Sequence, residues 1–269
     1  MIHAEFILNQ INGLSYLSRY EGFYSQQRFN STKKLIEIPL LKLTGSNLMI
    51  TLYTDCTPNG FKISIALEEL GLDYQVVDID FSKREQFSSQ FLKLNPNAKI
   101  PVIVDHDNDN YCVFESGAIL QYLAEKTGKL IPRSDKKRLD MMQWLFWQTS
   151  GLGPYVGQLL TFAVALEEQI PTAIERYLRE SRRLLSVLNG QLENKDYIIG
   201  DEHTIADIAA FPWVRILDLY PLPVELSDYP HVETWYKKLS EKPAYSKGVT
   251  IPPTAERQER LKIFRSALI

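Results

Sequence analysis

Cysteine and histidine are scarce in this chain. Its 269 residues include two cysteines, Cys56 and Cys112, and four histidines that are scattered along the sequence. No Cys-x-x-Cys pair and no Cys/His spacing typical of a zinc site occurs, so we expect no metal centre. Sparing use of cysteine is typical of proteins that work in a reducing compartment, and it favours a cytoplasmic location.

Long apolar runs and a strong net charge are also missing. No run approaches the roughly 18–20 apolar residues that a membrane-spanning helix needs, so we expect no membrane partner. The formal charge of −3 gives no reason to expect nucleic acid or an anionic membrane surface as a partner. What the chain does have is 45% hydrophobic residues and 11% aromatic residues, enough for sizeable cores in two domains or in one large one.

Residues 1–48 have no clean helix or strand period. They also lack the cationic start and apolar core of a secretory signal, and Glu5 and Glu21 argue against a mitochondrial transit peptide. The segment is either a poorly ordered extension or the product of a translation start placed too early, and the sequence leaves both readings open. In either case we expect it to be dispensable for folding and ligand binding.

Residues 49–131 alternate between strand and helix patterns. Thr57 and Pro58 stand where the N-cap and first residue of a helix should be, and Gly71 stands at its C-terminal end. Strands are predicted around this helix and beyond it at 50–53, 74–79, 101–104 and 111–114. A further helix opens at Glu115. The order βαβ followed by ββα predicts an α/β domain with a mixed sheet and helices packed on it.

Beyond a linker at 131–134 the pattern is almost entirely helical, which predicts an all-α domain over residues 132–256. The stretch 171–193 places its apolar residues on one face, as an amphipathic helix does. Residues 257–269 are expected to form a C-terminal tail.

Asp207 is a carboxylate in an apolar context, which invites a catalytic reading. Thr204 and Asp207, however, have the spacing of a capping box, so we interpret Asp207 as a folding element of the helix that begins there. Trp144, Phe146 and Trp147 are interpreted as core residues or as the wall of a cleft.

The segment from Cys56 to Asn59 is the most suggestive chemically. The helix that starts at Pro58 has unpaired N–H groups and a partial positive charge at its N-terminus. A thiolate brought to that position is stabilised without any metal. Cys56, Thr57 and Asn59 surround the position with thiol, hydroxyl and amide groups. The segment therefore predicts a site that activates sulfur.

A set of motifs resembles those of the glutathione transferases. They are Thr57–Gly60, Asn95–Pro101, Phe114–Leu120 and Gln143–Gln148. The family's fold, a thioredoxin-like βαβ-ββα domain followed by a helical domain, agrees with the predicted element order. In detail the motifs are similar to the nu class, the bacterial glutathione-dependent disulfide-bond oxidoreductases, which are related to the yeast nitrogen-catabolite prion regulator. The resemblance covers residues 49–250 and leaves the first segment out.

The resemblance implies that two of these motifs hold glutathione. The Ile100–Pro101 bond would be cis, turning the N–H and C=O of Ile100 toward the peptide of glutathione; read alone, Pro101 would be an ordinary trans proline. Glu115 would accept from the γ-glutamyl ammonium. Ser116 and the helix start behind it would bind the γ-glutamyl carboxylate, although Ser116 alone reads as an N-cap.

Further roles are implied for residues outside these two motifs. Asn59 would donate to the glutathione sulfur, with Thr57 close by, and these two are the catalytic candidates. Gln86 would contact glutathione, and Lys99 its glycyl carboxylate. Arg176 would hold a carboxylate of a second glutathione, within one subunit or across a dimer interface. Read alone, Asn59 and Arg176 would be solvated polar residues of their helices, and that alternative stays open.

Cys56 is where the sequence departs from the family pattern. Close relatives carry a small or aliphatic residue at this position, and cysteine-using relatives such as glutaredoxins place the cysteine directly before the proline. Here Thr57 intervenes. A thiol near a helix N-terminus can still be activated, so a redox role for Cys56 stays open. Its register favours a packed thiol that leans back toward the preceding strand. Cys112 lies in a predicted strand and is interpreted as inert.

The resemblance implies a homodimeric disulfide-bond reductase that uses bound glutathione rather than a protein cysteine, with small or protein disulfides as substrates. Two alternatives remain. One is conjugation of glutathione to electrophiles held in an apolar pocket of the helical domain. The other is a non-enzymatic regulatory or binding role on the same fold, as in the yeast regulator.

Overall fold

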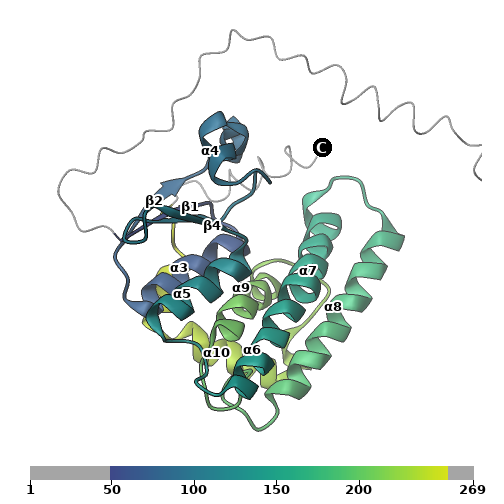
Figure 1. Ribbon diagram of the computed structural model, residues 1–269. Helices are drawn as coiled ribbons and strands as arrows, with labels where there is room; N and C mark the ends of the chain where they lie inside the picture. Colours follow the sequence, from purple (N-terminus) through teal and green to yellow (C-terminus); the bar gives the residue numbers. More distant parts are fainter. Residues whose placement is uncertain (1–48, 254–269) are drawn as a thin grey trace, which may run out of the picture. The chain divides into compact units, whose positions relative to one another are not determined.

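The computed structural model describes residues 49–253 (Figure 1). The expectations for residues 1–48 and 257–269 lie outside the described residues. The first elements, in chain order, are β1 (Ile50–Thr54), α3 (Pro58–Leu70), β2 (Tyr74–Asp78), two 3-10 turns (Phe81–Lys83 and Glu85–Phe87), α4 (Ser89–Leu94), β3 (Val102–Asp105), β4 (Tyr111–Phe114) and α5 (Ser116–Thr127).

The strands form one mixed sheet in the order β2-β1-β3-β4. β1 and β2 are parallel, whereas β1–β3 and β3–β4 are antiparallel. The predicted thioredoxin-like domain is confirmed. β3 begins at Val102 rather than at Pro101, because a proline has no N–H to donate to the ladder.

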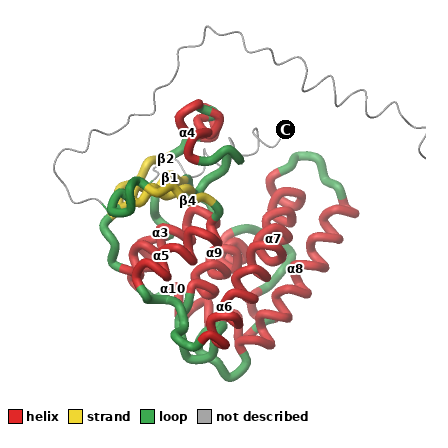
Figure 2. The backbone as a smooth tube through the Cα atoms, in the orientation of Figure 1, coloured by secondary structure: helices red, strands yellow, loops and turns green. Residues whose placement is uncertain are grey.

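Alternate residues of the strands face opposite sides of the sheet, as the period of two requires. Leu52 and Ile103 belong to the large core that α3 and α5 also build. Val102 faces the other side, where it clusters with Phe91 of α4. Figure 2 shows α4 on the opposite side of the sheet from α3 and α5. The sheet is therefore covered on both faces.

The remaining elements are helical, as predicted. They are α6 (Asp135–Trp147), α7 (Gly153–Leu160), α8 (Pro171–Leu192), α9 (Ile205–Leu219), α10 (Pro230–Ser240) and α11 (Pro243–Gly248), with π-helical turns at Gln148–Leu152 and Thr161–Ala165 and a 3-10 turn at Leu226–Asp228. Over residues 49–253, no helix combines the length and apolar character needed to cross a membrane.

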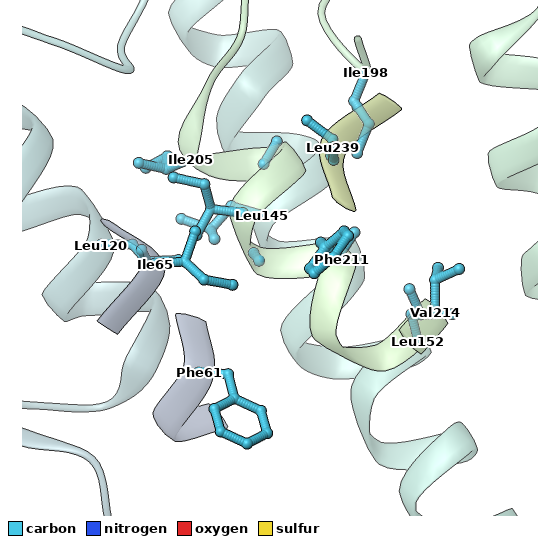
Figure 3. Packing of buried hydrophobic residues seen from close by; sticks show 14 of the residues in the cluster. Phe61, Ile65, Leu120, Leu145, Leu152, Ile198, Ile205, Phe211, Val214 and Leu239 are labelled. Atoms are coloured by element: carbon cyan, nitrogen blue, oxygen red, sulfur yellow. The ribbon is translucent and has the colours of Figure 1, made fainter. Parts of the chain in front are cut away.

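One apolar core runs through the sheet-bearing domain and the helical domain. Figure 3 shows part of it, with Phe61 and Ile65 from α3, Leu120 from α5, Leu145 from α6 and Phe211 from α9. The two domains are thus joined by a shared core, not by a linker alone.

The end of the helical domain closes against α3. A Cβ added to Gly248 would lie 2.7 Å from the backbone nitrogen of Ile65, so only glycine allows this approach. The hydroxyl of Ser64 donates to the Gly248 carbonyl at 2.7 Å and fixes the contact.

The sequence indicates that Trp144, Phe146 and Trp147 of α6 are core residues or the wall of a cleft, and for Phe146 the core interpretation is wrong. Phe146 is 63% exposed. Trp144 and Trp147 are half-buried and meet edge to face, with ring centroids 4.9 Å apart.

Asp207 is the capping-box residue that the sequence predicts. It is fully buried, and its carboxylate accepts from the backbone N–H of Thr204 at 3.0 Å and of Ile198 at 2.9 Å. The indole N–H of Trp235 donates to it at 3.0 Å. Burial raises the pKa of Asp207, and these hydrogen bonds oppose the rise. The carboxylate ties the start of α9 to α10 and to the preceding loop.

Replacing Asp207 with asparagine should lower the free energy of unfolding by about 2 kcal/mol, because the new NH₂ group faces an N–H donor in place of an acceptor oxygen. Chemical denaturation measures this, with the exposed Asp228→Asn as the matched control. Unchanged stability would show that the Asp207 carboxylate is not needed to hold the start of α9.

Candidate functional site

The segments that carry the predicted site meet at one end of the sheet. Val102, the first residue of β3, pairs with Tyr53 near the end of β1 and with Phe114 at the end of β4. Because both pairings are antiparallel, the chain leaving β1, the chain entering β3 and the chain leaving β4 lie side by side. Segments about fifty residues apart in sequence are brought together by strand register alone.

The turn between β1 and α3 has the predicted cap. The Thr57 hydroxyl accepts from the Gly60 N–H at 3.1 Å, and Pro58 is the first helical residue. Gly60 has to be glycine, because a Cβ there would lie 2.3 Å from the Thr54 hydroxyl. The half-buried amide of Asn59 has no hydrogen-bond partner within residues 49–253. A donor at a helix N-terminus is thus available to a ligand.

The Cys56 thiol donates to the carbonyl of Pro252, in the segment after α11, at 3.3 Å. The expected lean of the side chain toward β1 stays a prediction. The side chain is half-buried and packs against the main core. The thiol is therefore engaged with the end of the described chain, 196 residues further on.

Cys112 lies in β4, as predicted. Its thiol donates to the carbonyl of Leu94 at 3.3 Å. Burial raises the pKa of this thiol, so it stays protonated at neutral pH. The structure agrees with the interpretation of Cys112 as inert.

The loop that leads into β3 contains the predicted cis bond between Ile100 and Pro101. Asn95, which is buried, organises the loop from within: its Nδ2 donates to the Lys99 carbonyl at 2.7 Å and its Oδ1 accepts from the Asn97 N–H at 2.9 Å. The Lys99 side chain is exposed, where it can reach a carboxylate. Asn95 therefore positions both Lys99 and the backbone of Ile100.

Glu115 and Ser116 form the start of α5. Glu115 has a φ of 71°, a left-handed value that is strained for a residue with a Cβ, and its carboxylate is exposed. Ser116 is 7% exposed. Such strain persists where the surrounding structure enforces it, and it often marks ligand clamps.

Lys62 is a site residue that the sequence reasoning missed. It lies on α3, is 1% exposed, and its Nζ donates to the Ser116 hydroxyl at 3.2 Å and to Gln148 Oε1 at 2.7 Å. Burial lowers the pKa of Lys62 to about 7, and the charge of Glu115 opposes this. A signal was present in the sequence. α3 carries apolar residues on every side from Phe61 to Leu67, and a polar residue within such a stretch is expected to be buried.

Gln86 lies in the 3-10 turn Glu85–Phe87. Its Oε1 is buried and has no hydrogen-bond partner among the described residues. An orphaned acceptor of this kind needs a donor from outside, which fits contact with a ligand.

Arg176 is exposed on α8, which packs against α7 and α10. No contact within residues 49–253 connects it with the end of the sheet where the other predicted site residues gather.

The assembled groups suit a small zwitterionic peptide. The exposed Glu115 carboxylate is available to an ammonium, the helix starts at Asn59 and Ser116 supply donors for anions, and Gln86 offers an acceptor. Across the described ranges, no three His, Cys, Asp or Glu side chains gather in a way that could hold a metal ion. The fold is that of a thioredoxin-like domain joined to a helical domain.

Comparison with known proteins identifies the family. The pattern described as "Glutathione S-transferase, N-terminal domain" matches residues 48–125, and "Glutathione S-transferase, C-terminal domain" matches residues 154–243. The disulfide-bond oxidoreductase YfcG of Escherichia coli is 46% identical over 200 residues, covering 73% of this chain and 92% of YfcG. YghU, a disulfide-bond oxidoreductase of the same organism, is 41% identical over 212 residues, covering 74% of this chain and 73% of YghU.

A solved structure agrees with these relatives. A glutathione transferase from Pseudomonas putida, with one glutathione disulfide bound per subunit, has a TM-score of 0.71 and 39% identity, covering 76% of this chain and 92% of the other. This chain belongs to the glutathione transferase family.

Proposed function

We propose that this protein is a glutathione-dependent disulfide-bond reductase that uses bound glutathione instead of a cysteine of its own. The observation that carries the proposal is the start of α3. The Asn59 amide is available there beside the Thr57 cap, at the end of the sheet where the cis Ile100–Pro101 loop lies. The Cys56 thiol is turned to Pro252. Relatives named as disulfide-bond oxidoreductases support the same reading.

In the proposed reaction, two glutathiones and one disulfide give glutathione disulfide and two thiols. The first thiolate attacks one sulfur of the substrate, the S–S bond breaks, and the other sulfur leaves as a thiolate that takes up a proton. The second glutathione then attacks the resulting mixed disulfide and releases the second thiol. The protein favours the attacking thiolate through the α3 N-terminus and Asn59, and it orients the thiolate along the S–S axis.

The remaining residues hold glutathione in place. Glu115 and Ser116 bind the γ-glutamyl end, and the backbone of Ile100, next to Pro101, pairs with the cysteinyl peptide. Gln86 and Lys99 complete the contacts, with Lys99 on the glycyl carboxylate. The buried orphaned Oε1 of Gln86 and the exposed Lys99 side chain support these assignments.

Arg176 is assigned to a second glutathione. Because its side chain is exposed on α8, it is available to a ligand that extends beyond the first site, or to one held by a partner subunit. We propose a homodimer, supported by large exposed apolar side chains on β4 and α6, among them Phe114 and Phe146. Since the reaction consumes reduced glutathione, its expected setting is the reducing cytoplasm.

A paired assay tests the function. With reduced glutathione present, kcat/KM for a small disulfide such as 2-hydroxyethyl disulfide should exceed that for an aromatic chloride. The reason is that Thr57 and Asn59 stand where conjugating classes carry a catalytic tyrosine or serine. Strong conjugation without disulfide reduction would favour a conjugating transferase, and glutathione binding with neither activity would favour a regulatory protein.

A further inference from the structure

A buried cation lies directly beneath the proposed γ-glutamyl site. Lys62 reaches from α3 to the first residue of α5, where its Nζ is 3.2 Å from the Ser116 hydroxyl. On its other side it donates to Gln148 Oε1, in the turn after α6, at 2.7 Å. Its ammonium also lies 5.8 Å from the ring centroid of Trp213 on α9. Three elements therefore hold this ammonium in one place.

The groups that touch this ammonium do not neutralise it. Ser116 and Gln148 are neutral acceptors, and both are buried. Glu115 acts on Lys62 through its charge, but its carboxylate is exposed to water and screened by it. A buried ammonium is costly unless an anion pairs with it. In the free protein the charge of Lys62 is thus incompletely compensated.

We propose that Lys62 is a positioning residue that fixes the Ser116 hydroxyl for the γ-glutamyl carboxylate of glutathione and takes up a proton as glutathione binds. The inference rests on the proposed function. A serine oxygen that accepts from Lys62 keeps its single O–H for another partner. That O–H donates to the carboxylate, and the carboxylate in turn supplies the negative charge that Lys62 lacks.

The elements packed against α3 carry other charged groups as well. They include Glu115 at the start of α5, Asp55 after β1, Arg215 of α9, and Lys242 and Lys247 at the two ends of α11. Glu125 and Lys126 lie at the far end of α5, and α9 also carries Asp207 and Asp218. Lys242 and Lys247 pair with carboxylates near the far end of α3, at 3.1 and 2.9 Å. Arg215 lies over the ring of Phe61, 5.8 Å from its centroid. Glu115, part of the clamp itself, is the group whose charge acts on Lys62.

The sign of the pH dependence follows from this environment. Burial lowers the pKa of Lys62 to about 7, so the free protein loses this proton as the pH rises above neutrality. A bound carboxylate stabilises the charged lysine and raises its pKa. The affinity for glutathione is therefore highest below about pH 7 and falls as the pH rises. It levels off above the pKa that Lys62 has in the complex.

Calorimetry with S-methylglutathione, whose sulfur cannot ionise, tests the proposal. Titrations in two buffers of different ionisation enthalpy, slightly above neutral pH, should show proton uptake by the wild-type protein. From about pH 6 to about pH 8.5, wild-type affinity should fall about tenfold more than that of Lys62→Met. This variant keeps an apolar stem and removes the charge, so it should bind about tenfold more weakly at the acidic end. The exposed Lys129→Met is the matched control and should behave as wild type.

A second measurement does not depend on the variant folding. In wild-type protein with isotope-labelled lysine, the NMR signal of Lys62 should titrate near neutral pH and move to higher pH when S-methylglutathione is added. Binding without proton uptake, or a Lys62 titration that the ligand leaves unchanged, would overturn the inference and leave the reductase proposal intact. Absence of binding at every pH would overturn the proposed function, and this inference with it.

Discussion

Replacing Glu115 with alanine should weaken glutathione binding by about 2–4 kcal/mol, or roughly 30- to 800-fold in Kd. The variant removes the proposed partner of the γ-glutamyl ammonium. The ammonium of bound glutathione is then left without a carboxylate to pair with. It also removes the carboxylate whose charge acts on buried Lys62. Backbone strain does not account for the loss, because alanine meets the same restriction as glutamate at a φ of 71°.

Calorimetry with glutathione measures this effect. Glu125→Ala, an exposed glutamate further along α5, serves as the matched control and should bind as wild type. Glu115→Gln keeps the shape of the side chain without its charge, so it should lose most of the same affinity. If Glu115→Ala binds glutathione as tightly as wild type, the clamp is wrongly assigned.

Replacing Asn59 with alanine should lower kcat/KM for disulfide reduction by about ten- to a hundred-fold. The amide is proposed to donate to the glutathione thiolate, and a hydrogen bond to a charged group contributes about 1.5–3 kcal/mol. The pH–rate profile makes the assignment specific, since the pKa of the bound thiol should rise in the variant. The helix itself should survive, because the cap is made by Thr57 and not by Asn59.

Kinetics and pH–rate profiles with a small disulfide measure this effect. Ser89→Ala, an exposed residue at the start of α4, is a control for a change at another helix N-terminus. An Asn59→Ala enzyme with unchanged kcat/KM would show that the helix start alone activates the sulfur.

Local chemistry made part of the site predictable. The cap at Thr57 and the capping box at Thr204 and Asp207 depend on residues within three positions of each other, so the sequence shows them directly. The cis bond before Pro101 was predictable only through the family motif, because a lone proline favours trans.

The other features of the site depend on packing between residues far apart in the sequence, so their contacts could not be predicted. Lys62 and Gln148 are 86 residues apart, and only the seating of the helical domain on α3 brings them together. Cys56 meets Pro252 across 196 residues, so no residue close to Cys56 in the sequence could indicate this hydrogen bond. Phe146 is exposed although Trp144 and Trp147 are half-buried, since which face of α6 is covered depends on the packing around it.

The central claim is that the reacting thiols come from glutathione and not from the protein. Since the chain contains two cysteines, the double variant Cys56→Ala/Cys112→Ala is cysteine-free and tests the claim most directly. Circular dichroism should first verify its fold, because each thiol donates one hydrogen bond to a carbonyl. The folded variant should retain most of the wild-type turnover of a small disulfide with glutathione. Loss of turnover in the folded variant, together with a glutathione adduct on Cys56 of the wild-type enzyme by mass spectrometry, would contradict it.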